Sequence, residues 1–146
     1  MISQTTEYAL RAMVILCSDI ERQWTTAEIA KLSKVPPDYL SKVLQQLTKA
    51  KLIMSLRGAK GGFRLFKKPE ELTILEVVQA VDPLPRIRKC PLGLRSHGTN
   101  LCALHRRLDN AMELVEKAFA NSTLSELVPT RSSVKNSTPC EFPLAK

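Results

Sequence analysis

The sequence predicts a mainly α-helical protein with a winged helix-turn-helix, a two-stranded wing and a long C-terminal helix. Three observations predict this class. Aromatic residues make up only 5% of a chain of 146 residues that is 44% hydrophobic. Two short amphipathic helices meet at a turn within residues 25–49, and a basic, glycine-rich hairpin follows them. A chain of this length is expected to bury a single core.

The charge balance narrows the class of partner. Lys and Arg number 22 against 14 Asp and Glu, which gives a net charge of +8 and a pI near 9.6. Such an excess favours a polyanion, most commonly nucleic acid. No apolar run reaches the roughly 18 residues of a membrane span, and the N-terminus lacks signal-peptide features, so we expect a cytoplasmic protein without a membrane partner. In that reducing compartment, cysteines serve as metal ligands or redox sensors more often than as disulfides.

The N-terminal half contains three expected helices. The first runs from Ser3 to about Cys17, with Ser3 or Thr5 as its cap. The second begins at Thr25, which has the capping-box spacing to Glu28. After a turn over 33–35, two prolines at 36–37 open the third helix, whose core stripe comprises Leu40, Val43, Leu44 and Leu47.

The stretch RGAKGGFRL over 57–65 predicts a wing. Residues 52–56 and 63–66 read as short strands, and Gly58, Gly61 and Gly62 permit the positive-φ turn between them. A nucleotide-binding glycine loop would precede a helix, whereas here a strand follows. The side chains expected to face phosphates or base edges are Thr26, Asp38, Tyr39, Ser41, Lys42, Gln45, Gln46, Lys49, Arg57, Lys60 and Arg64. The alternative is an ordinary packed helix pair with a solvated face.

The C-terminal half contains a helix, a loop and a longer helix. Thr73 is a possible cap for the helix within LTILEVVQAVD, and residues 83–99 form a loop rich in proline and basic residues. Apolar residues in three- and four-residue steps then predict a dimerisation helix from Leu101 to Phe119. The expected parts are a DNA-binding domain over 1–82, a cysteine-containing loop over 83–99, a dimerisation region over 100–129 and a disordered tail over 130–146.

The motif TEYALRA over 6–12, the helix-turn-helix, the wing motif, the cysteine-containing loop and the long helix together resemble the Rrf2 family of bacterial transcription regulators. The resemblance runs from about residue 1 to 128. It implies a homodimeric winged-helix protein that binds a palindromic DNA operator, most commonly as a repressor.

The same resemblance implies a metal site. The metal-binding branch of the family places three cysteines six residues apart before the dimerisation helix; Cys90 and Cys102 match the outer two, and Ser96 stands at the middle position. His105 and a partner subunit's Glu7 match positions where family members offer further ligands, and His97 is an additional candidate. Two thiolates with N or O ligands can hold a [2Fe–2S] cluster, which would sense redox state, iron or nitric oxide.

A simpler reading remains open for each of these residues. In that interpretation the chain is a metal-free member of the family whose loop cysteines bind nothing, His105 is a surface residue on a helix, and Glu7 complements the helix dipole. Cys17 is expected to be a small core residue, and Cys140 to have no metal role.

The function that these observations favour is sequence-specific DNA binding and transcriptional control. The alternative is a basic module that docks on protein or RNA. A docking module has no evident need for a glycine-rich hairpin that carries three cations, so the wing favours DNA binding. An enzyme is not expected, and no catalytic residues are assigned, because neither histidine has a nucleophile partner at a readable spacing.

Overall fold

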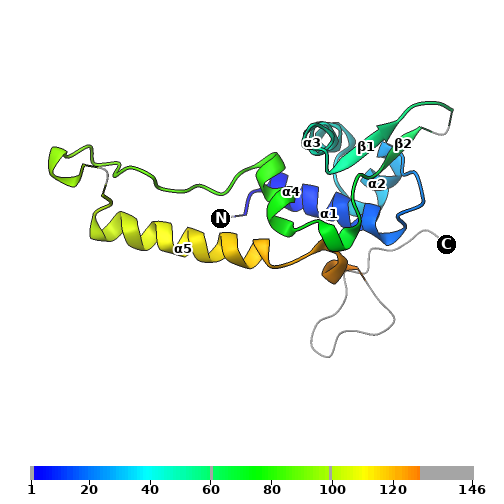
Figure 1. Cartoon of the computed structure of the whole chain (residues 1–146). Coiled ribbons are helices and arrows are strands. Elements are labelled where there is room, and N and C mark those ends of the chain that lie inside the picture. Colours follow the sequence, from blue (N-terminus) through cyan, green and yellow to red (C-terminus); the bar gives the residue numbers. More distant parts are fainter. Residues whose placement is uncertain (1, 60, 99, 129–146) are drawn as a thin grey trace.

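The computed structural model describes residues 2–59, 61–98 and 100–128, and Figure 1 shows its arrangement. Lys60, Cys140 and the tail expected to be disordered lie outside the described residues. The helices and strands in chain order are α1 (Gln4–Ser18), α2 (Thr26–Ser33), α3 (Pro37–Lys49), β1 (Ile53–Leu56), β2 (Gly62–Leu65), α4 (Ile74–Val81) and α5 (Ala103–Ala120). Short 3-10 turns occupy Pro69–Glu71, Arg95–His97 and Leu124–Leu127. The predicted mainly helical winged-helix class is confirmed.

Helix α1 lies at the centre of the core. Ser3 is its N-cap, and the Ser3 hydroxyl accepts the backbone N–H of Thr6 at 3.2 Å. The buried face of α1 packs against α2, α3 and α4. Met13 and Leu16 are fully buried there, and the expected core residue Cys17 is buried as well.

The helix-turn-helix forms as its sequence signals predict. Thr25 and Glu28 complete a reciprocal capping box at the start of α2. Lys34 ends that helix with φ 56°, the left-handed conformation that redirects the chain toward α3. Pro37 opens α3 without losing an intrahelical hydrogen bond. The predicted stripe of four apolar residues on α3 is completely buried.

The wing is a two-stranded antiparallel hairpin in which Ile53 pairs with Leu65 and Leu56 with Gly62. The expected strands were one residue out of position, because β1 begins at Ile53 and β2 covers Gly62–Leu65. Gly58 has the positive φ that the turn requires, at 123°. Gly61 and Gly62 serve a different purpose from the one expected, since neither has a positive φ.

Helix α5 projects from the winged-helix body (Figure 1). The segment between α4 and α5 runs outward beside this helix, and α5 then leads back toward the body. No residue of α5 is buried within the protomer. Immediately after α5, the chain returns to the core: Leu124 is fully buried and its N–H donates to the Leu72 carbonyl at 2.8 Å. Residues 122–128 therefore pack on the winged-helix body, although the sequence grouped them with the dimerisation region.

Two further findings concern the chain as a whole. Within the described residues, no helix combines the length and the apolar character needed to cross a lipid bilayer. Cys17, Cys90 and Cys102 are all free thiols.

Candidate DNA-binding surface and metal centre

The outer face of α3 presents polar side chains to solvent. Asp38, Lys42, Gln45, Gln46 and Lys49 are all exposed, as expected for a helix that reads DNA. Several of them line a hollow of about 680 Å³ that extends to the ends of α1 and α4. Amides and ammonium groups on one helix face can reach base edges and phosphates of a major groove.

Two other predicted contact residues of α3 are already engaged within the protein. The Tyr39 hydroxyl shares a hydrogen bond with Thr5, and its ring meets Tyr8 edge to face with centroids 5.4 Å apart. The Ser41 hydroxyl donates to the Pro37 carbonyl at 3.0 Å. These bonds fix both side chains, so Tyr39 in particular orients α3 on α1. Thr26, at the start of α2, is half-buried.

The wing is held to the body by Trp24. The backbone N–H of Trp24 donates to the Phe63 carbonyl at 2.9 Å, and the backbone N–H of Phe63 donates to the Trp24 carbonyl at 2.8 Å. A Cβ on Gly62 would lie 2.6 Å from the Trp24 carbonyl oxygen, and one on Gly61 would lie 2.7 Å from that of Leu56. Both glycines are therefore required by close backbone approach.

Two of the three wing cations are described by the structure. Arg57 is exposed at the end of β1. Arg64 is half-buried on β2 and donates through Nε to the Met54 sulfur at 3.4 Å on the neighbouring strand. Lys60 lies outside the described residues. Arg57 is thus the wing cation that this structure places free to reach a phosphate.

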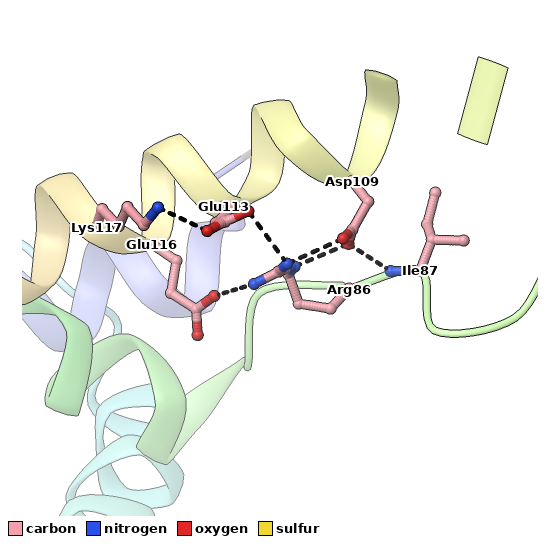
Figure 2. Close-up of polar contacts among 6 residues, drawn as sticks. All are labelled: Arg86, Ile87, Asp109, Glu113, Glu116 and Lys117. Atoms are coloured by element: carbon pink, nitrogen blue, oxygen red, sulfur yellow. Dashed lines mark hydrogen bonds and ion pairs between the residues drawn. The ribbon is translucent and has the colours of Figure 1, made fainter. Parts of the chain in front are cut away.

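Arg86 fastens the cysteine-containing loop to α5, as Figure 2 shows. Its guanidinium donates two hydrogen bonds to Asp109, Nε–Oδ1 at 2.8 Å and Nη2–Oδ2 at 2.9 Å. It also donates through Nη1 to Oε2 of Glu116 at 2.5 Å. Asp109 also accepts the Ile87 N–H at 2.9 Å. The Arg86 guanidinium and then the Ile87 N–H lower the pKa of Asp109 to about 2. Bidentate pairing of this kind fixes both position and direction.

Beyond this clamp, the loop brings two thiols and two imidazoles together. Cys90 Sγ lies 3.2 Å from His97 Nδ1 and 3.6 Å from His105 Nδ1, and Cys102 Sγ lies 3.1 Å from His105 Nδ1. The ligand atoms of Cys90, Cys102 and His105 all lie within 4.8 Å of one another. Two thiols and an imidazole that converge in this way suit a borderline or soft metal ion.

Local structure explains why Cys102 and His105 meet. Cys102 is the N-cap of α5 and makes no side-chain cap hydrogen bond, while His105 occupies the third helical position. An N-cap side chain and the side chain at this position face each other, as in a capping box.

The cysteines of the chain differ in acidity. Hydrogen bonding from His97, followed by the backbone N–H of Leu92, lowers the pKa of Cys90 to about 6, so its sulfur is a thiolate at neutral pH. Burial raises the pKa of Cys17 to about 12, which suits an unreactive core residue. The two thiols thus have opposite chemical character.

Glu7 does not join the metal-binding group within the protomer. Arg11 holds the Glu7 carboxylate through Nε at 2.7 Å and through Nη2 at 2.6 Å. A role as a ligand from the partner subunit would require this ion pair to open or to share the carboxylate.

Two features that hold the loop and the wing in place were not predicted from the sequence. Asp109, Glu113 and Glu116 recur in steps of four and three residues, so they form an acidic stripe on α5 opposite the basic run that contains Arg86. That complementarity was a readable signal for the clamp. The pairing of Trp24 with Phe63 joins residues far apart in the chain, and no local pattern indicates it.

Comparisons with known proteins show which family the chain belongs to. The family model described as "Rrf2: Iron-dependent Transcriptional regulator" matches residues 2–130. The HTH-type transcriptional regulator NsrR of Geobacillus kaustophilus is 30% identical over 141 residues, which cover 92% of this chain and 94% of NsrR.

Two solved structures share the fold. CymR (YrzC), the global cysteine regulator of B. subtilis, superposes with a TM-score of 0.71 at 22% identity, covering 87% of this chain and 95% of CymR. IscR of T. potens gives a TM-score of 0.70 at 20% identity, covering 86% of this chain and 84% of IscR. On the strength of the family match and the NsrR identity, this chain belongs to the Rrf2 family of transcriptional regulators.

Proposed function

We propose that this chain is a homodimeric, sequence-specific DNA-binding repressor rather than an enzyme, and that a metal-containing group in its loop controls DNA affinity. The observation that carries the DNA-binding proposal is the exposed polar face of α3 beside the wing that bears Arg57. The net charge of +8 supports it, because phosphate contacts supply most of the affinity for a duplex. A dimer bound at a promoter would repress by occupying DNA that the polymerase needs.

Helix α5 supports the dimer proposal. Two leucines of the predicted stripe, Leu104 and Leu108, are 61% and 49% exposed in the protomer. Pairing of two such helices would bury these side chains and relate the two recognition helices by a twofold axis. A palindromic operator, with half-sites about 34 Å apart or a multiple of that distance, is the matching DNA target.

The metal part of the proposal uses the Cys90, Cys102 and His105 group. A [2Fe–2S] cluster of the kind expected from the sequence would take three ligands from these residues and the fourth from Glu7 of the partner subunit. An exchangeable or redox-active metal would supply the sensing chemistry. Cys90 is four residues beyond the Arg86 clamp and Cys102 caps α5, so a change at these cysteines acts directly on the N-terminal end of the dimerisation helix.

Selection from a pool of random duplexes tests the DNA-binding proposal. Full-length protein is expected to enrich two inverted half-sites, which a mobility-shift assay then confirms. Gln45→Ala is expected to reduce discrimination between bases by roughly 1–3 kcal/mol, because a bidentate contact is lost. Lys117→Ala is the control, since this exposed lysine lies on α5 and pairs with Glu113 at 2.6 Å.

Two results would contradict the proposal. Binding that enriches no sequence, or that prefers RNA, would instead favour a basic docking module. Expression from a promoter carrying the enriched site should rise when the gene for this protein is deleted, and an unchanged or lower level would rule out repression.

A further inference from the structure

The loop before α5 holds one more donor than the three-residue group. His97 Nδ1 contacts Cys90 Sγ at 3.2 Å, so the contacts run without a break from His97 to Cys90, from Cys90 to His105 and from His105 to Cys102. All four residues belong to the segment 90–105 of one protomer. The middle position of the family's cysteine spacing is occupied by Ser96, and the imidazole of the next residue contacts the Cys90 thiol instead.

Backbone turns direct His97 toward Cys90. The Gly93 N–H donates to the Cys90 carbonyl at 3.3 Å, and Gly93 has φ 64°, which reverses the chain directly after the cysteine. A second turn follows, in which the His97 N–H donates to the Leu94 carbonyl at 3.0 Å. The Asn100 N–H then donates to the His97 carbonyl at 2.8 Å. Successive turns of this kind place residues seven apart in the chain next to each other.

Three of the donor separations match those between ligands of one tetrahedral ion, whereas His97 contacts Cys90 from outside the three-residue group and would move closer to the other donors on binding. With metal–sulfur bonds of about 2.3 Å and metal–nitrogen bonds of about 2.0–2.1 Å, two ligands on the same ion have S···N separations of about 3.5 Å. The three observed S···N distances are 3.1, 3.2 and 3.6 Å. Ligands divided between the two irons of a cluster would lie farther apart than ligands that share one ion.

We propose that Cys90, His97, Cys102 and His105 form a mononuclear tetrahedral site for a divalent transition-metal ion of the zinc or iron(II) class. This assignment rests on the proposal above that the loop holds a metal. Two thiolates and two neutral imidazoles balance the charge of a divalent ion, and an S₂N₂ donor set suits such ions. The ligand set is complete within one protomer, so the Glu7 carboxylate stays with Arg11.

The site has a structural consequence. The thiols lose their protons on binding, and the metal joins the turn at Cys90 to the cap of α5 at Cys102. The Arg86 clamp already fixes the loop to the middle of α5. Metal binding would therefore order the segment between two fixed points, without a ligand that crosses the dimer interface.

Titration of chelator-treated, reduced full-length protein with Co(II) tests the site. The expected result is about one Co(II) per protomer, with the intense visible absorption of tetrahedral, thiolate-bound Co(II), and displacement of that ion by Zn(II). His97→Ala is expected to weaken Co(II) binding by at least about 10- to 100-fold, since loss of an outer-shell partner alone costs that much. Ser96→Ala is the matched control on the neighbouring residue, and circular dichroism checks that each variant is folded.

Two further measurements distinguish the mononuclear site from a site that uses Glu7 and from a [2Fe–2S] cluster. Glu7→Gln should leave the Co(II) spectrum and affinity unchanged; loss of binding in this variant would overturn the intraprotomer ligand set. Anaerobically purified protein with about two irons and two sulfides per protomer, whose colour survives His97→Ala, would overturn the mononuclear site in favour of a [2Fe–2S] cluster. Failure of Co(II) to bind at all would also overturn it. Because none of these readouts involves DNA, failure of the metal site and failure of DNA binding are distinguishable.

Discussion

Replacing Leu124 with Ala tests how the chain beyond α5 is anchored to the winged-helix body. Leu124 is fully buried, so the substitution removes about three buried carbon groups at about 0.8 kcal/mol each. The backbone around it is pinned, because the Leu124 N–H donates to the Leu72 carbonyl at 2.8 Å and the Ile74 N–H donates to the Ser122 carbonyl at 2.9 Å. Because these hydrogen bonds hold the backbone in place, the surrounding residues cannot close around the smaller side chain and a cavity remains. The cavity raises the expected loss of unfolding free energy to about 3–4 kcal/mol.

Urea denaturation followed by circular dichroism measures this loss at a fixed protein concentration, since dimerisation contributes to the stability of each protomer. Leu92→Ala is the matched control, because Leu92 is 59% exposed and its loss should change the unfolding free energy by no more than about 0.5 kcal/mol. A Leu124→Ala variant within about 0.5 kcal/mol of the wild type would refute the reasoning. It would show that residues 122–128 do not belong to the core.

Three further outcomes are expected. Arg57→Ala should lower the slope of log affinity for DNA against log salt by about 1, whereas Gln46→Ala should keep that slope and relax base preference; identical mobility-shift behaviour would contradict these roles. Gly62→Ala should destabilise the wing by about 1–3 kcal/mol through the two hydrogen bonds that its Cβ displaces at Trp24, and an unchanged thermal midpoint would show that the backbone yields freely. The folded-state pKa of Asp109 is lowered from 3.8 to about 2, so its stabilising contribution is full above the unfolded value and is lost as pH falls through the folded value. Asp109→Asn should flatten the acid dependence of unfolding in that window, and parallel curves for variant and wild type would argue against the clamp.

The sequence by itself determined the local elements. Ser3, Thr25 and Thr73 cap their helices by bonding to backbone groups three residues away, as their spacings predicted. The paired prolines before α3 and the apolar stripe on its inner face likewise act within a few residues. Signals of such short range survive in any tertiary context, which is why the winged-helix class was predictable.

The candidate metal centre was predictable only in part. Cys102 and His105 are three residues apart at a helix start, so their proximity follows from helix geometry. The approach of Cys90 to them, and of His97 to Cys90, depends on the turns at Gly93 and at Arg95–His97, where small changes in φ and ψ would move the donors apart. The sequence therefore named the candidates but not their arrangement.

Only the tertiary structure decided which distant residues meet. Trp24 holds the wing through Phe63, and Leu124 returns to a core whose other members precede it by more than 40 residues. Each contact depends on how whole elements pack, because burial and backbone pairing are shared among many residues rather than encoded in one spacing. The same packing leaves no side chain of α5 buried within the protomer. Periodicity alone could not distinguish this arrangement from burial of α5 against its own domain.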